Sequence, residues 1–248
     1  MQKIFIVLLS LFCILSGYAE HKKFTKRDGF LSIPDKLDVY FFDSQSHYLV
    51  LRDEGSVKKP KYGSLDAAMK KSPCVAGVNG GFFGADVDGI PLGLTIQDGK
   101  RLSPLATGSF VVLGVVYQEG KDIKLERSSV FKKRKSFSGI NTAVQGGPFL
   151  VEKGKVVKGL DNKKSAFRTF IATDGKGKWC LGVSSALTLH ELATWLQKPK
   201  ALGNFQIQTA LNFDGGSSSA FWCYESGVSY PSYKQVRNYL GVAPRQQQ

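Results

Sequence analysis

Short apolar stretches alternate with polar residues along much of the chain, and they predict more strand than helix. The alternation over residues 37–50 indicates a hairpin, and the continuous apolar run 75–78 indicates a buried strand. Further strands are predicted in the same way at 91–96, 109–117, 123–125, 167–173, 179–183 and 208–213. Residues 174–177, Asp-Gly-Lys-Gly, have the composition of a turn between two of these strands. Strands therefore dominate the predicted fold.

Two segments carry the start signals of helices. Thr188 and Glu191 have the spacing of a capping box, in which each side chain bonds to the backbone amide of the other residue. The apolar face of this helix is formed by Leu189, Leu192, Ala193 and Leu196. His190 is therefore expected on the helix surface rather than in catalysis. Ser64 likewise caps a short helix that stops before Pro73.

These two helices belong to segments that follow one plan, residues 64–81 and 188–216. Each segment has a short helix, a connection, and an apolar strand that ends in a polar residue and a Gly-Gly turn. We predict a pseudo-duplicated helix-plus-sheet core with both turns at one site. Long tracts of strand with few helices are typical of the α+β class. The predicted fold is a single strand-rich α+β domain over residues 37–248.

The N-terminus has the three parts of a secretory signal peptide. Lys3 supplies positive charge, residues 4–15 form an apolar run too short to span a bilayer, and small residues precede a cleavage site after Ala19. Residues 1–19 are thus predicted to be removed, and the polar, basic residues 20–36 to form a mobile lead-in. We predict an exported protein, periplasmic or extracellular, with no stable membrane anchor.

Cysteine usage agrees with export and leaves one pairing open. Lipid attachment to Cys13 is disfavoured because a bulky phenylalanine precedes it, so three cysteines remain after cleavage. Cys180 and Cys223 lie in strand-like aromatic runs and could form a disulfide in an oxidising compartment. Three buried thiols, with Cys74 as the third, are the alternative.

No cofactor or metal is predicted from the motifs present. No Cys-x-x-Cys or His-Glu-x-x-His spacing occurs, and the three histidines are scattered. Asp86 and Asp88 could hold calcium, but a loop is the simpler interpretation.

Charge points to an anionic partner outside the cytoplasm. The chain has 34 Lys and Arg against 20 Asp and Glu, which gives a formal net charge of +14. An intracellular protein with this excess would suggest nucleic acid, but behind a signal peptide the excess favours anionic envelope polymers, and no nucleic-acid partner is predicted. The basic run 132–135 is interpreted as a solvated loop, with a polyanion site as the alternative.

A hydrophobic content of 42% excludes a disordered chain.

The 27 glycines have no three-residue period, which excludes collagen, and some of them form Gly-Gly pairs after apolar strands. These pairs are 80–81, 146–147 and 215–216. Glycine lets backbone amides approach a ligand, and successive amides can form an anion-binding nest. Asn79 and Asp214 precede two of the pairs and place a polar group at the rigid exit of a strand. No Walker loop or Gly-x-Gly-x-x-Gly motif is present, so nucleotide binding is not supported.

Arg168 lies inside an otherwise apolar or hydroxylic strand and needs an anionic partner there. That partner is either structural, with Asp214 as the candidate, or the phosphate of a substrate. The serines after Gly216 lack a Gly-x-Ser-x-Gly elbow, and the Ser-x-x-Lys matches lack their companion motifs, so a serine nucleophile is not predicted.

Five motifs occur in an order that resembles the phosphodiester glycosidase family. They are residues 77–83 (GVNGGFF), 146–150 (GGPFL), 168–169 (RT), 187–193 (LTLHELA) and 210–218 (ALNFDGGSS), and the resemblance covers about residues 64–243. The family commonly has Asp-Gly-Gly-Gly-Ser where this chain has Asp214-Gly215-Gly216-Ser217. It often has Asn-Arg-Pro where this chain has Tyr230-Pro231-Ser232.

The resemblance implies a secreted hydrolase that cleaves the sugar C1–O bond of a sugar-1-phosphodiester or phosphoglycan, which releases free sugar and a phosphomonoester. A phosphate leaving group needs little general-acid help, so one carboxylate and a cationic clamp suffice. Asp214 is the candidate nucleophile or general base, Arg168 the phosphate clamp, and Asn79 an orienting group for hydroxyls or water. Substrate binding is assigned to Gly80, Gly81, Gly146, Gly147, Asn212, Gly215, Gly216, Ser217 and Ser218.

Two alternatives remain open. In the structural one, Asp214 only caps a turn and the asparagines only satisfy strand ends. In the functional one, the protein is a non-catalytic module that binds anionic exopolysaccharide or teichoic-type polymer through its lysines.

Overall fold

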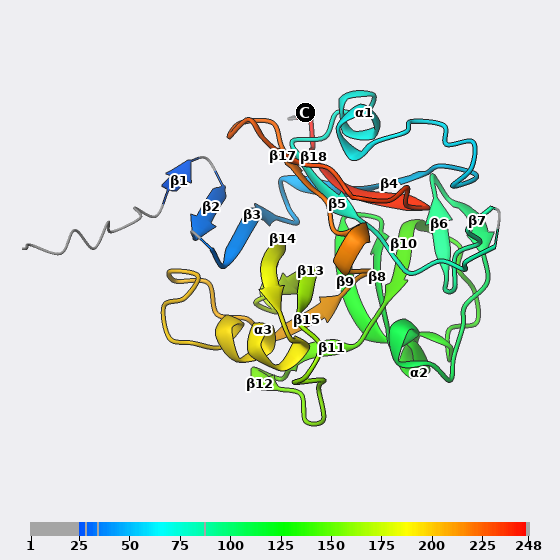
Figure 1. Cartoon of the computed structure of the whole chain (residues 1–248). Coiled ribbons are helices and arrows are strands. Elements are labelled where there is room, and N and C mark those ends of the chain that lie inside the picture. The colour runs from blue at the N-terminus through cyan, green and yellow to red at the C-terminus, as the bar shows by residue number, and fades with distance from the viewer. Residues whose placement is uncertain (1–24, 28, 34, 87, 247–248) are drawn as a thin grey trace, which may run out of the picture.

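A computed structural model describes residues 25–27, 29–33, 35–86 and 88–246 (Figure 1). The predicted signal peptide lies outside the described residues. Three antiparallel sheets form the framework of the described chain, and the predicted strand-rich α+β class is confirmed. The largest sheet has the order β1 (Thr25–Arg27), β2 (Phe30–Ile33), β3 (Leu37–Asp43), β14 (Lys178–Leu187), β13 (Ala166–Thr173), β15 (Thr209–Asn212), β11 (Phe149–Glu152) and β12 (Lys155–Val156).

The other two sheets have five strands each. One has the order β7 (Lys100–Ser103), β6 (Thr95–Gln97), β10 (Ile140–Gly146), β8 (Gly114–Glu119) and β9 (Asp122–Arg127). The other has the order β17 (Val228–Tyr230), β16 (Phe221–Cys223), β5 (Ala76–Asn79), β18 (Asn238–Pro244) and β4 (His47–Asp53). The helices are α1 (Leu65–Lys70), α2 (Ser128–Phe131) and α3 (Leu189–Leu196), with short 3-10 turns η1 (Phe110–Val112) and η2 (Gly216–Ser218).

The three sheets enclose a common hydrophobic core. Each sheet contributes buried side chains to it, among them Leu181, Leu211, Val144, Val116, Val78 and Leu240. Each helix then covers the outer face of one sheet: α3 packs against the eight-stranded sheet, α1 against the β5 sheet and α2 against the β8 sheet (Figure 1). Strand alternation explains the two layers, because Ile171 of β13 faces the central core while its neighbours Phe170 and Ala172 face α3.

Both capped helices form as predicted. The Glu191 amide donates to Thr188 Oγ1 at 3.1 Å, and the Thr188 amide donates to the Glu191 carboxylate at 2.8 Å. Ser64 caps α1 by accepting the amide of Ala67 at 3.2 Å. His190 is exposed on α3, as expected. These signals are local, so tertiary contacts do not override them.

Strand partners differ from the prediction in one region. The predicted hairpin over residues 37–50 is wrong, because β3 pairs with β2 and β14 whereas β4 pairs with β18 in another sheet. The connection between them bends away, and its Ser44 amide donates to Gly177 O at 2.9 Å. Alternation indicates that residues are in strands but does not specify which strands pair.

Two further segments differ from the prediction. Residues 110–112 form η1, capped by Ser109, so the predicted strand 109–117 begins only at Gly114. Within the basic segment 20–36, Phe30–Ile33 forms strand β2, and Phe30 and Ile33 are buried against the core. Three apolar residues in this segment outweigh its overall basic composition.

The three described cysteines are buried and unpaired. Cys180 lies in β14 and Cys223 in β16, which belong to different sheets. Burial raises the pKa of Cys74 to about 12 and also raises that of Cys180, so both thiols stay protonated. The structure thus has the three buried thiols that the sequence left as the alternative to a disulfide.

Candidate functional site

The ends of β5 and β15 meet although they belong to different sheets. Asn79 Nδ2, at the end of β5, donates to the backbone oxygen of Asp214 at 2.7 Å. The Asp214 amide in turn donates to Gly80 O at 3.3 Å. The structure thereby brings together the two polar residues that precede Gly-Gly turns. Whether the two segments are a duplication stays a prediction.

The side chain of Asn79 joins three parts of the chain. Its Oδ1 accepts from Thr169 Oγ1 in β13 at 2.7 Å and from the Ala220 amide at 3.0 Å, while Nδ2 bonds to Asp214. Only 1% of Asn79 is exposed. Its hydrogen bonds go to protein groups, so Asn79 holds the loop that carries Asp214 rather than facing solvent.

The third Gly-Gly turn is fastened to the same place. The Gly147 amide donates to Asn212 O at 2.7 Å, and Asn212 Nδ2 donates back to Gly147 O at 2.9 Å. Asn212 is buried, and within the described residues its Oδ1 has no hydrogen-bond partner. We call residues 79–81, 146–147 and 212–216 together the glycine-turn junction.

Four of the six Gly-Gly amides that were predicted to form an anion nest already donate to protein groups. The amides of Gly80 and Gly81 donate to Asn238 O at 2.9 Å and Asn238 Oδ1 at 3.1 Å. The Gly147 amide donates to Asn212 O, as described above, and the Gly215 amide donates to Asp214 Oδ1 at 2.9 Å. An amide carries one hydrogen, so these four groups hold the junction together instead of binding an anion.

Asn238 was not predicted as part of the site. It lies at the start of β18, is 1% exposed, and bonds to both glycines of the first turn. A Cβ on Gly80 would overlap Asn238 Oδ1, which explains the requirement for glycine there. No local motif marks this residue, because its partners are about 160 positions away in sequence.

Asp214 is the carboxylate of the junction. It is partly buried between the end of β15 and η2. Burial raises its pKa, while the Ser218 hydroxyl, the Lys234 ammonium and the Gly215 amide act in the opposite direction. A carboxylate with a raised pKa is a stronger base than an exposed one. Ser218 is buried beside it, whereas Ser217 is exposed.

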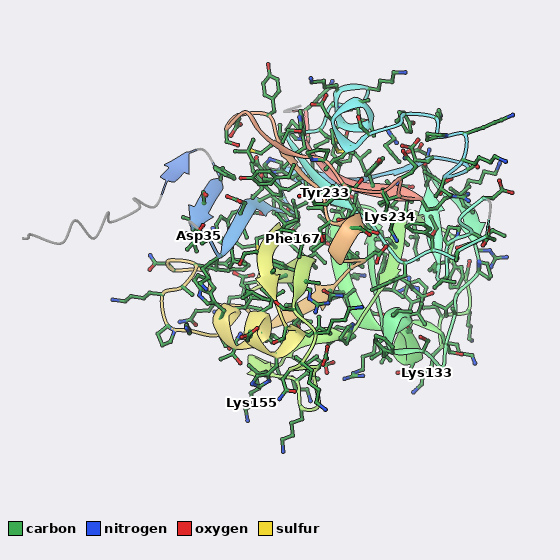
Figure 2. All side chains as sticks on the ribbon, viewed as in Figure 1. Asp35, Lys133, Lys155, Phe167, Tyr233 and Lys234 are labelled. Carbon is green, nitrogen blue, oxygen red and sulfur yellow. The ribbon has the colours of Figure 1, made fainter. Side chains whose placement is uncertain are left out.

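Lys234 is the second residue that the sequence did not identify. Its backbone amide and that of Tyr233 donate to Ser217 O at 3.1 and 2.9 Å, which fixes this loop to η2. Its Nζ lies 4.9 Å from the centroid of the Phe83 ring. Figure 2 shows Tyr233, Phe167 and Lys234 near the centre of the view. The Lys234 ammonium is thus close enough to the Asp214 carboxylate to lower its pKa.

Arg168 is held mainly by backbone oxygens. Nε donates to Leu187 O at 2.9 Å and one terminal nitrogen donates to Lys164 O at 2.6 Å. Burial lowers its pKa, and the nearby Asp161 carboxylate opposes this. Asp161, rather than Asp214, is therefore the carboxylate that acts on this guanidinium. Within the described residues, hydrogen bonds are found for these two nitrogens and none for the other terminal nitrogen.

The stem of Arg168 nevertheless passes beside the junction. A Cβ placed on Gly215 would lie 2.9 Å from Phe167 O and 3.7 Å from Arg168 Cδ. Gly215 thus allows β13 and the Asp214 loop to pack closely.

Metal-binding geometry is absent from the part of the chain that the structure describes. No three His, Cys, Asp or Glu side chains there are grouped to hold an ion. Of the helices in the described residues, none is long and apolar enough to cross a membrane.

Comparison with known families matches residues 72–243 to phosphodiester glycosidase. The chain belongs to the phosphodiester glycosidase family. The resemblance in the five motifs is thereby confirmed. The matched range contains the whole glycine-turn junction together with Arg168, Lys234 and Asn238. Strands β2 and β3 lie before it.

Solved structures show the same fold. The catalytic domain of zebrafish N-acetylglucosamine-1-phosphodiester alpha-N-acetylglucosaminidase, auto-inhibited by its pro-peptide, has a TM-score of 0.62 and 17% identity, covering 84% of this chain and 78% of that one. A hypothetical protein from Synechocystis has a TM-score of 0.55 and 15% identity, covering 87% and 61%. A protein from Burkholderia pseudomallei, named as exported, has a TM-score of 0.54 and 12% identity, covering 84% and 74%. No curated protein matched the sequence.

Proposed function

We propose that this family member is an exported glycosidase. Its substrate would be a sugar-1-phosphodiester, in the cell envelope or in an extracellular glycopolymer. Family membership and the zebrafish enzyme of the same fold support this chemistry. The name of the Burkholderia protein supports export.

In the proposed reaction, water attacks the sugar C1 and the C1–O bond breaks, with its electron pair passing to the phosphate oxygen. Asp214 takes a proton from the water, and this proton later passes to solvent. The products are a free sugar and a phosphomonoester. Lys234 and the guanidinium of Arg168 would neutralise the phosphate as its charge increases.

The observation that carries the proposal is the environment of Asp214. It is a partly buried carboxylate with a raised pKa, it has a lysine beside it, and the stem of an arginine passes its loop. A general base needs to be partly shielded from water yet remain ionisable near the working pH. Asn79 and Asn238 would act as positioning residues, because their bonds fix the loop and the turns beside it.

The test is turnover of an N-acetylglucosamine-1-phospho-ester, with free sugar and phosphomonoester measured together. We expect Asp214→Asn to lower kcat by about 100- to 10,000-fold with little change in affinity. Asp122→Asn, an exposed position on β9, is the control for loss of one negative charge. Release of sugar-1-phosphate would identify a phosphodiesterase instead.

A second candidate function is a non-catalytic module for anionic exopolysaccharide or teichoic-type polymer. The exposed side chains of Lys132, Lys133 and Lys135 favour it (Figure 2 labels Lys133). Polymer binding that weakens with salt and is unchanged by Asp214→Asn, with no cleavage of any phosphodiester tested, would support this candidate.

Export has its own test, because the predicted signal peptide lies outside the described residues. Protein recovered from outside the cytoplasm is expected to begin at Glu20 when its intact mass is measured. Material that retains Met1 there would exclude the predicted cleavage.

A further inference from the structure

A cavity of about 430 Å³ borders the loop that carries Asp214. It lies between the β2–β3 turn, the start of β13 and the loop 230–233. Its volume is within the range of small-molecule sites in proteins. We call it the aromatic cavity, and the residues that the argument uses are Asp38, Phe167, Ser219, Tyr230 and Tyr233.

None of the residues of the glycine-turn junction lines the cavity, but three of the lining residues are tied to the junction. Ser219 follows η2 directly, and Tyr233 bonds to Ser217 O through its amide at 2.9 Å. Phe167 adjoins Arg168, and its backbone oxygen lies against Gly215. The cavity is therefore connected through η2 to the loop that carries Asp214.

Two oxygen atoms of the cavity walls are buried without a partner. Asp38 Oδ1 and Ser219 Oγ are inaccessible to solvent and form no hydrogen bond within the described residues. Burying such a group unpaired costs about 1–3 kcal/mol. Both belong to residues that line the cavity, so a ligand hydroxyl would supply the missing partner once either side chain turns toward the cavity.

Tyr230 is linked to the same carboxylate. Burial raises its pKa, and the charge of Asp38 and a hydrogen bond to it raise the pKa further. The phenol therefore stays protonated and donates. The Tyr230 hydrogen is used on Asp38, so the pair offers its oxygens as acceptors for sugar hydroxyls.

The mouth of the cavity carries exposed aromatic rings. Phe167 is 43% exposed and Tyr233 is 82% exposed. Their rings are within 28° of parallel, with centroids 6.5 Å apart. Figure 2 shows these two side chains near the centre of the view, with Asp35 farther to the left. Large exposed aromatics beside a cavity favour binding of a flat, partly apolar surface, such as the C–H face of a pyranose ring.

The cavity differs in charge from the surroundings of Lys234 and Arg168, which we assign to phosphate binding. Two carboxylates, Asp35 and Asp38, line it with one lysine, Lys36, although the whole chain carries a formal charge of +14. The negative charge of these two carboxylates disfavours a nearby phosphate or uronate. The cavity is thus suited to an uncharged ring, while the phosphate would lie toward Lys234 and Arg168.

We infer that the aromatic cavity is a subsite for an uncharged pyranose ring of the substrate. Asp38 accepts from sugar hydroxyls, and Phe167 and Tyr233 pack against the ring. The inference rests on the proposed function and adds the substrate class. Asp38 lies outside the family match over residues 72–243, so this chain's specificity would depend on a residue that the family does not supply.

The test measures binding separately from turnover. Methyl glycosides of N-acetylglucosamine, glucose and galactose are titrated by NMR, with methyl glucuronide as the charged probe. We expect at least one uncharged glycoside to bind more tightly than the glucuronide. Asp38→Asn and Tyr233→Ala should each weaken that binding about tenfold, with no effect of Asp122→Asn. Tyr233 is exposed, so its variant folds even if Asp38→Asn does not.

The outcomes are distinct. Failure of all three glycosides to bind, equal or tighter binding of the glucuronide, or binding unchanged in both variants would overturn the subsite. Turnover of a sugar-1-phosphodiester with KM unchanged in both variants would also overturn it and leave the proposed function standing. Glycoside binding that depends on Asp38, with no phosphodiester cleaved, would support the subsite and reject the activity.

Discussion

The glycine-turn junction and the aromatic cavity lie on two sides of one loop, but their polar groups are used differently. In the junction, Asn79 is almost fully buried and bonds to Thr169, Ala220 and Asp214. In the cavity, Tyr233 is largely exposed, while buried oxygens without a partner within the described residues occur on both sides: Asp38 Oδ1 and Ser219 Oγ in the cavity, Asn212 Oδ1 in the junction. The junction is therefore a rigid support and the cavity an open surface.

This difference bears on how sequence motifs relate to function. The Gly-Gly turns are conspicuous because three sheets can approach only where side chains are absent. Their amides hold the support together, and of the junction residues Asp214 is the one that keeps a reactive group near a cation. The residues expected to select a substrate lie beside the motifs rather than within them.

The largest expected effect is on the support. Asn79→Ala should lower the free energy of unfolding by about 2–4 kcal/mol, because it leaves the Thr169 hydroxyl, the Ala220 amide and the Asp214 carbonyl without their partner. Denaturant unfolding measures this, with exposed Asn204→Ala as the matched control. A loss under about 0.5 kcal/mol, in the range of surface substitutions, would contradict the supporting role.

The next largest effect is expected on catalysis, from removing the positive charge of Lys234 beside Asp214. Lys234→Gln should lower kcat/KM about 10- to 30-fold, which corresponds to the loss of one charge-assisted contact. Lys234 lowers the pKa of Asp214, so its removal raises that pKa and moves the acidic limb of the pH–rate profile to higher pH.

Lys234→Arg should keep the profile near that of the wild type, and Lys133→Gln, at an exposed lysine, should change neither quantity. An unchanged acidic limb in Lys234→Gln would mean that the ammonium does not act on the catalytic carboxylate.

What could be predicted from the sequence depends on how local the signal is. The capping box of α3 and the cap of α1 are contained within four residues, and both form as predicted. The pairing of β3 with β14 joins positions about 140 residues apart, and nothing near β3 indicates it. The predicted hairpin was wrong for that reason.

The same distinction applies to the site. Asn79 and Asp214 stand out because each polar residue ends an apolar strand, and the structure brings the two together. Lys234, Asn238 and Asp38 have no such context, since a lysine in a loop or an aspartate in an alternating strand looks like any solvated residue. Their importance arises from partners far along the chain, such as Gly81 for Asn238 and Tyr230 for Asp38, which a single sequence does not reveal.

A smaller effect concerns the cost of keeping Asp214 buried. Asp214→Asn should raise the free energy of unfolding by about 0.5–2 kcal/mol at neutral pH while lowering kcat about 100- to 10,000-fold. The folded-state pKa of Asp214 is raised, so its protonated form favours folding at low pH, and that contribution is lost as pH rises through the folded pKa. The advantage of the variant should therefore shrink as pH falls.

Thermal unfolding at several pH values measures this, with Asp122→Asn for comparison. If Asp214→Asn is less stable than the wild type at neutral pH, the carboxylate has a structural role like that of Asn79, and the separation of support from catalysis fails.

The smallest expected change in stability lies in the aromatic cavity. Tyr233→Ala removes a ring that is 82% exposed and packs mainly against Phe167, so the free energy of unfolding should change by no more than about 0.5 kcal/mol. The same substitution should raise KM for a phosphodiester whose sugar is uncharged, with kcat close to the wild-type value, because the lost contact is present equally before and during the reaction. Tyr224→Ala, at another exposed tyrosine outside the cavity lining, is the matched control. A stability loss as large as that of Asn79→Ala would show that the ring supports the fold, and the contrast between the two sides of the loop would disappear.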